Sequence, residues 1–156
     1  MPKSIEIRSA EFADSGKIIE FNGRMAEETE GVKLDPDVLY SGVQAVLKEP
    51  GHGFYLIAVA GGQVVGCLLV TTEWSDWRNG EFWWIQSVYV EPEFRRRGVF
   101  RSLYEATRQR AQKSDRVCGF RLYVERENVQ AQKTYTRLGM KETAYRMLEA
   151  LFEKER

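Results

Sequence analysis

Residues 90–98 read Val-Glu-Pro-Glu-Phe-Arg-Arg-Arg-Gly, and no other stretch of the chain says as much about its architecture. A β-rich run ends at Val90 and Pro92, and a helical pattern of apolar residues then begins at Val99. The first N–H groups of a helix lack internal partners, and the helix dipole attracts negative charge. A basic loop ending in Gly98 therefore predicts a phosphate or pyrophosphate site, with a solvated charge cluster as the alternative.

Length and composition favour one globular domain over residues 1–156, because 43% apolar content is enough for a core. The 23 basic and 23 acidic residues balance, which argues against a nucleic-acid partner. A single histidine, His52, and no CxxC pair predict no metal site. We expect Cys67 and Cys118 to be buried free thiols, and a cytoplasmic protein with no membrane span and no secretory leader.

Hydrophobic periodicity predicts an alternating order of strands and helices. The expected strands are at residues 5–8, 54–60, 64–72, 81–90, 120–124 and 143–148, and the expected helices at 14–25, 36–47, 99–114 and 129–138. Gly61-Gly62 reads as a hairpin turn. A single strand–helix–strand crossover implies one parallel pair, so the fold class is α+β with a mostly antiparallel mixed sheet flanked by helices.

Two motifs resemble those of the GNAT superfamily of N-acetyltransferases. The first is the acyl-CoA-binding motif [Q/R]-x-x-G-x-[G/A], in which Arg95 and Gly98 match and Phe100 departs from the expected Gly or Ala. The second is N-x-x-A-x-x-x-Y-x-x-L-G-M, which begins at Asn128 and includes Tyr135. A capped helix alone would explain Asn128 but not Tyr135. The resemblance covers roughly residues 5–149 and implies the GNAT fold, with its parallel crossover after the CoA-binding strand.

The resemblance implies acetyl-CoA as co-substrate and a set of residues that bind it. These are Val88, Tyr89, Val90, Arg95, Arg96, Arg97, Gly98, Val99, Phe100, Arg101, Asn128 and Tyr135. The Val88 amide would polarise the thioester carbonyl, and Tyr135 would act as the general acid. Some family members carry a Glu where this chain has Gln86, so no general base is assigned; Glu28, Glu30 and Glu73 are candidates acting through water.

A primary amine, small and cationic, is the expected acceptor. Carboxylates and aromatic faces bind ammonium ions, and this pattern suggests Glu27, Glu28, Glu30, Trp77 and Trp83. The alternatives are a solvated acidic surface and tryptophans that lie in the core or form a homodimer contact. A second function from another class also stays open: a non-catalytic acyl-CoA-binding sensor module, which Phe100 and Gln86 favour and Tyr135 disfavours.

Overall fold

A computed structural model describes residues 4–153, which fall into two compact units, one ending at Tyr123 and the other beginning at Val124. The elements of the first unit are β1 (Ile5–Ser9), α1 (Ser15–Glu30), α2 (Pro36–Lys48), β2 (Phe54–Ala60), β3 (Gln63–Ser75), β4 (Gly80–Val90), α3 (Val99–Gln112) and β5 (Val117–Arg121), with short 3-10 turns at Phe12–Asp14, Pro50–His52 and Pro92–Phe94. The second unit contains α4 (Val129–Arg137). The single domain over residues 1–156 stays a prediction, because compactness alone does not show whether the units fold together.

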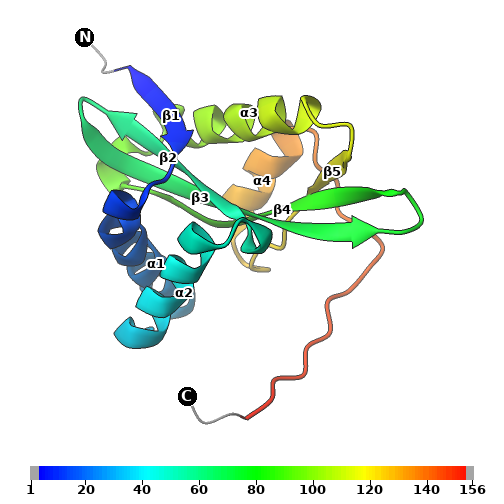
Figure 1. Cartoon of the computed structure of the whole chain (residues 1–156), viewed down its shortest axis with the longest axis horizontal. Coiled ribbons are helices and arrows are strands. Elements are labelled where there is room, and N and C mark those ends of the chain that lie inside the picture. The colour runs from blue at the N-terminus through cyan, green and yellow to red at the C-terminus, as the bar shows by residue number, and fades with distance from the viewer. Residues whose placement is uncertain (1–3, 154–156) are drawn as a thin grey trace. The chain divides into compact units, whose positions relative to one another are not determined.

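The sheet runs in the order β1-β2-β3-β4-β5 (Figure 1). Strands β1 to β4 pair antiparallel with their sequence neighbours, whereas β4 and β5 pair parallel through the crossover helix α3. The predicted fold class is therefore confirmed: an α+β, GNAT-like mixed sheet, mostly antiparallel, with one parallel crossover after β4.

Local signals place the first two helices where the sequence predicts them. Asp35 caps α2 by accepting hydrogen bonds from the backbone N–H groups of Asp37, at 2.9 Å, and Val38, at 3.3 Å. Helix α1 begins after Asp14 and ends at Gly31, whose φ of 64° is the left-handed conformation typical of a helix C-terminus. It extends beyond the predicted residue 25 to Glu30.

The two faces of the sheet are covered by different helices: α1 and α2 lie on one face and α3 on the other (Figure 1). The core on the first face consists of Ile18, Phe21, Val43, Tyr55, Ile57, Cys67, Leu69 and Tyr89. On the second face, Val99 and Leu103 pack over Gly66, where an added Cβ would lie 3.0 Å from the Tyr89 carbonyl oxygen. This close approach brings α3 directly onto the strands that carry its preceding loop.

Strand β4 contains a bulge that separates its two ends. Cys67 pairs with Tyr89 but Leu69 pairs with Gln86, so one residue of β3 opposes two of β4, and Ser87 has a φ of 49°. Pairing with β5 covers only the first part of β4 and ends at Trp84. Among the described residues, no strand therefore pairs with residues 85–90 on the β5 side.

Three sequence predictions differ from the structure. The strand predicted at 120–124 lies at Val117–Arg121, because its register follows from pairing with β4 rather than from its own apolar residues. No strand forms at 143–148; this segment is exposed along its length and pairs with no other strand in the described residues. Cys118 is a free thiol as expected but is exposed, whereas Cys67 is buried.

Candidate functional site

The arginine loop, residues 95–98, connects the turn after β4 to the first residue of α3. Two of its residues have left-handed backbones: Arg96, with a φ of 64°, and Gly98, with a φ of 82°. Gly98 is the N-cap of α3, and its carbonyl accepts a hydrogen bond from the Ser102 N–H at 3.0 Å. Since glycine has no side chain, it cannot cap the first N–H groups of the helix itself.

The geometry at Gly98 fits an anion. A Cβ added there would meet no atom within 4 Å, so the space in front of the backbone is open. The N-terminus of α3 directs its unpaired N–H groups and the positive end of its dipole into the same region. Val99 is buried, and the Phe100 ring packs against the ring of Tyr104 with 6.1 Å between centroids. Phe100, which stands where the motif has Gly or Ala, thus packs against the next turn of its own helix.

The side chain of Arg95 turns away from this region and contacts the strand and helix α1. Its Nε donates to the Val90 carbonyl at 2.9 Å, and its guanidinium donates to Glu28 Oε2 at 2.9 Å. The guanidinium also lies over the Tyr89 ring, 5.2 Å from the centroid. Arg97 stacks over Phe94 at 5.7 Å. Arg95 and Arg97 therefore have different neighbours and do not form a single basic cluster.

Glu28 is held from two sides. Tyr89 donates its hydroxyl to Glu28 Oε1 at 2.8 Å, while Arg95 binds the other carboxylate oxygen. Burial alone would raise the pKa of Glu28, but the hydrogen bonds from Tyr89 and Arg95 outweigh it, so the pKa is lowered. Burial raises the pKa of Tyr89, and the hydrogen bond to the Glu28 carboxylate raises it further.

Nearby, a second set of ion pairs joins α1 to the end of β4. The Arg24 guanidinium donates to both oxygens of Glu91, at 3.2 and 3.1 Å. Sequence analysis did not identify this pair, because its members lie 67 positions apart and carry no motif. The pair fixes helix α1 against the start of the turn that precedes the arginine loop.

The open edge of β4 presents backbone groups beside the loop. The Glu91 N–H donates to the Val65 carbonyl at 2.8 Å, on the β3 side. Because backbone groups alternate in direction along a strand, the Val90 N–H points toward the side where β4 has no partner among the described residues, whereas the bulge at Ser87 interrupts this alternation before Val88. An extended ligand can pair with such an edge as an added strand does.

The second motif residues lie on α4 in the second unit. Asn128 caps this helix, its side-chain oxygen accepting from the Ala131 N–H at 3.2 Å, and Gly139 follows the helix with a φ of 95°. The backbone N–H of Met140 donates to the Tyr135 carbonyl at 3.0 Å. Burial raises the pKa of the Tyr135 phenol, so it remains protonated at neutral pH.

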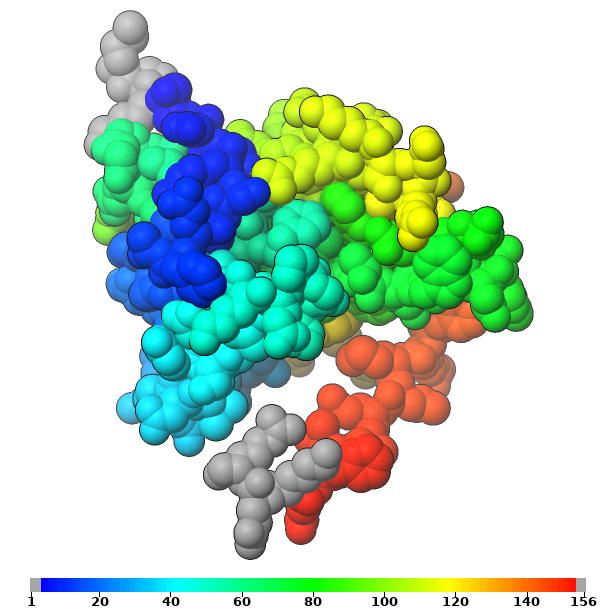
Figure 2. All heavy atoms as spheres, viewed as in Figure 1, coloured from blue at the N-terminus to red at the C-terminus, as the bar shows by residue number. Residues whose placement is uncertain are grey.

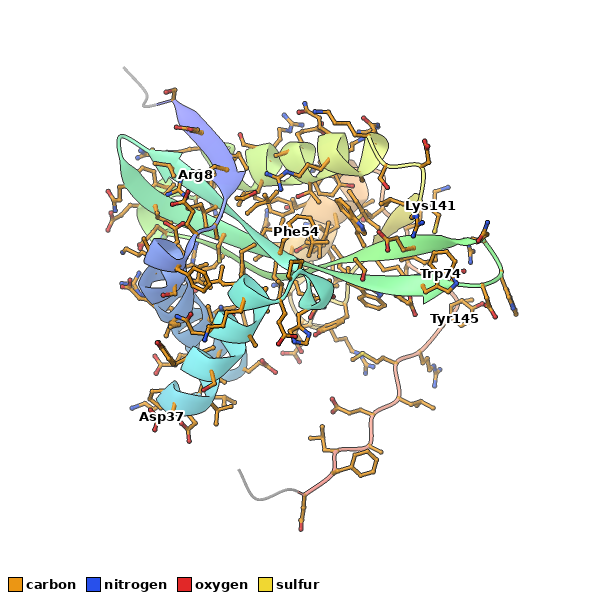
Figure 3. All side chains as sticks on the ribbon, viewed as in Figure 1. Arg8, Asp37, Phe54, Trp74, Lys141 and Tyr145 are labelled. Atoms are coloured by element: carbon orange, nitrogen blue, oxygen red, sulfur yellow. The ribbon has the colours of Figure 1, made fainter. Side chains whose placement is uncertain are left out.

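The predicted acceptor residues lie in three different environments. Glu27 and Glu30 are exposed on the last turn of α1. Trp77 is 87% exposed at the end of the β3–β4 hairpin, which lies clear of α1 and α2 (Figure 2). Trp74 is also exposed, on the same hairpin (Figure 3). Trp83 is instead buried, with its ring 5.2 Å from Phe54.

Strands β3, β4 and β5 carry a group of polar contacts that sequence analysis did not bring together, although it named Glu73 and Gln86 separately. Trp84 and Arg121 both donate to Glu73 Oε1, at 3.2 and 2.7 Å. Gln86 donates to the Thr71 hydroxyl. Because side chains alternate between the two faces of a strand, the sequence could have placed Trp84 and Gln86 on the same face of β4. It could not have placed Arg121 beside them, because the register of β5 against β4 cannot be read from the sequence.

Two classes of site are not found among residues 4–153. No group of three or more His, Cys, Asp or Glu residues in this part of the chain is arranged to hold a metal ion. None of the helices described is both long and apolar enough to span a bilayer.

Comparisons with known proteins agree with this geometry. The sequence model of the acetyltransferase (GNAT) family matches residues 19–140. A possible acetyltransferase from Clostridium difficile 630 is 45% identical, with a TM-score of 0.90 over 96% of this chain and 99% of the other. A predicted acetyltransferase with acetyl-CoA from Clostridium acetobutylicum shares the fold at 16% identity, with a TM-score of 0.77 over 94% and 96% of the two chains. The aminoglycoside N-acetyltransferase AAC(6')-Iy in complex with CoA shares it at 19% identity, with a TM-score of 0.73 over 100% and 97%. No curated protein matches the chain.

Proposed function

Because the chain belongs to the acetyltransferase (GNAT) family, we propose that it transfers an acetyl group from acetyl-CoA to a primary amine, with a small cationic molecule as acceptor. One observation carries this proposal. The arginine loop leads into the N-terminus of α3 and follows the part of β4 that no described strand pairs on the β5 side, which is the arrangement that a pyrophosphate site next to a peptide-like binding edge would need.

The backbone of this chain would supply most of the cofactor contacts. The N–H groups of residues 96–101 would bind the pyrophosphate, with Arg96 and Arg97 adding positive charge. The Val88 backbone and the Val90 N–H would pair with the pantetheine amides, while the Val90 carbonyl accepts from Arg95, and Tyr89 would hold this strand in place through its ring and hydroxyl. Acetyl-CoA itself supplies the activated thioester.

In the reaction we propose, the neutral amine nitrogen attacks the thioester carbon and the C–S bond breaks. The Val88 N–H would stabilise the charge that develops on the carbonyl oxygen. Tyr135 would donate its proton to the departing thiolate and recover one from solvent, and the proton of the attacking amine would leave to water. The Tyr135 phenol is protonated at neutral pH and so has a proton to donate, although burial, which raises its pKa, makes it a weaker acid.

For the acceptor we propose recognition by charge. Glu27 and Glu30 make no side-chain hydrogen bond or ion pair with any other described residue, so their charges are available to a cation. Trp77, on a hairpin that lies clear of α1, offers a separate exposed aromatic face for a cation–π contact, and it is the most exposed of the tryptophans for the predicted homodimer contact. The cytoplasmic location stays a prediction.

Free-thiol release from acetyl-CoA, measured across a panel of monoamines and diamines, tests the proposal. We expect release that depends on the amine; a blank without amine corrects for the exposed thiol of Cys118. Gly98→Asp should abolish it, because a negative side chain would occupy the phosphate space. Gly62→Asp is the matched control, since Gly62 also has a positive φ, of 78°, and open space around it, but lies in the β2–β3 turn.

The outcomes separate the two candidate functions. Activity that survives in Gly98→Asp would remove the arginine loop from the cofactor site. Stabilisation of the parent protein by CoA without turnover of any amine would instead identify a non-catalytic acyl-CoA sensor.

A further inference from the structure

We propose that Glu28 is a positioning residue for the cofactor: it holds Arg95, and through Arg95 the loop whose backbone binds pyrophosphate. This inference rests on the proposed function and refines it, because it moves one of the acidic residues of α1 from the acceptor side to the cofactor side. Glu28 would touch neither substrate.

The first argument is the set of contacts around Arg95. The guanidinium is fixed at three places: the Glu28 carboxylate at 2.9 Å, the Val90 carbonyl at 2.9 Å and the face of Tyr89 at 5.2 Å. The contact with Val90 links the last residue of β4 to the first residue of the loop. The contact with Glu28 links the loop to α1, 67 positions away in the sequence.

The second argument is the difference between Glu28 and its acidic neighbours. Both oxygens of Glu28 accept hydrogen bonds, one from Tyr89 at 2.8 Å and one from Arg95. Glu27 and Glu30 make no such contact with any described residue, although all three lie on the last turns of α1. A carboxylate that is already paired with a guanidinium attracts a second cation only weakly, so Glu28 is the least suited of the three to bind an amine.

The third argument concerns the backbone that follows Arg95. Arg96 is in the left-handed conformation, with a φ of 64°, which is uncommon for a residue with a side chain and persists only where neighbouring contacts hold it. Fixing Arg95 on both the strand side and the helix side supplies such contacts. The amides of residues 96–98 are then oriented before the ligand arrives, and a preorganised loop binds more tightly than a mobile one.

A simple charge effect predicts the opposite sign, which makes the inference testable. Removal of a carboxylate near a phosphate site should strengthen binding of the highly anionic CoA if only Coulomb interactions matter. Loss of the tether should weaken it. Loss of an acceptor contact should leave CoA binding unchanged and raise the KM of the amine.

The experiment measures the Kd of CoA by calorimetry, and kcat and KM for the best amine, in Glu28→Gln and in Glu105→Gln. Glu105 is the control, because it is also a helical surface glutamate near an arginine, 3.9 Å from Arg108 on α3. We expect Glu28→Gln to raise the Kd of CoA about 3- to 10-fold, with kcat at saturating acetyl-CoA and the KM of the amine changed by less than about twofold. The control should bind CoA as the parent does. In an Arg95→Gln background, Glu28→Gln should have a smaller effect, limited to the loss of its hydrogen bond with Tyr89.

Two results would overturn the inference: CoA binding that is unchanged or tighter in Glu28→Gln, or an equal loss of affinity in both backgrounds. The pair itself is read separately in the ligand-free protein by NMR titration of the Glu28 carboxylate, whose pKa should rise in Arg95→Gln because the guanidinium no longer stabilises the charged form. A parent protein that shows this pair but binds no CoA would refute the proposed function rather than the tether. A carboxylate that does not respond to Arg95→Gln would refute the tether itself.

Discussion

Replacement of Gly66 by alanine tests whether the packing between β3, β4 and α3 is as close as the structure requires. The added Cβ would lie 3.0 Å from the Tyr89 carbonyl oxygen and 3.2 Å from Val99 Cγ1. Both contacts are shorter than van der Waals distance, and both neighbours are buried, so neither can move aside freely. Overpacking of this kind destabilises a core by about 1–3 kcal/mol. For a chain of this length the melting temperature should fall by about 3–9 °C.

The matched control for Gly66→Ala is Gly42→Ala. Gly42 lies inside α2, and a Cβ there would meet nothing within 4 Å. Alanine is the better helix former, so this change should stabilise the protein by about 0.5–1 kcal/mol. Urea unfolding followed by circular dichroism measures both changes. If Gly66→Ala were as stable as Gly42→Ala, the close contact between α3 and the sheet would not exist in solution.

Three further predictions concern catalysis, recognition and acid stability. Tyr135→Phe should lower kcat about 10- to 1,000-fold with little change in CoA affinity. If the variant kept the kcat of the parent under conditions where the chemical step limits the rate, Tyr135 would be excluded as the general acid. Trp77→Leu should raise the KM of a cationic amine about 2- to 30-fold. An equal rise for an uncharged acceptor would indicate a packing role instead, and a change in the mass of the protein measured by light scattering would indicate a dimer contact. Asp14 accepts a hydrogen bond from Arg8 at 2.8 Å, and this bond lowers the pKa of the Asp14 carboxyl from the usual range of an aspartate. A carboxyl whose pKa is lower in the folded state than in the unfolded state stabilises the fold at any pH above its unfolded-state pKa. This contribution to the free energy of unfolding is lost as the pH falls through the folded-state pKa. Asp14→Asn should therefore cost about 1–2 kcal/mol at pH 7 and progressively less as the pH falls below the usual range of an aspartate, as measured by urea unfolding across this range.

The parts of the fold that were predicted correctly depend on signals within a few residues. Asp35 before Pro36 specifies the start of a helix, and Gly61-Gly62 specifies a hairpin, whichever strands lie beyond. The strand–loop–helix around Gly98 is local in the same sense. Its backbone geometry follows from a glycine that adopts a positive φ directly before an apolar helical repeat.

The parts that failed depend on pairing between distant residues. Apolar residues occur in both 117–121 and 120–124, and only the partner residues on β4 decide which of them form the strand. At 143–148 the composition is suitable for a strand, but strand formation needs a partner for its hydrogen bonds. Burial differs between Cys67 and Cys118 for the same reason: the first lies on a central strand and the second on the edge strand β5.

Arg95 shows how the same limit applies within a functional motif. Its position in the sequence predicts a positive charge beside phosphate, yet its side chain pairs with Glu28, 67 residues earlier, and with the carbonyl of Val90. The proposed phosphate site needs only main-chain N–H groups and open space at Gly98, and these do not depend on which side chain stands at position 95. The side chain is therefore available for a different task, which is to hold the loop that carries those groups. Charge in a sequence predicts what a loop can bind, whereas the distant partner of each charge decides whether it binds the ligand or shapes the site.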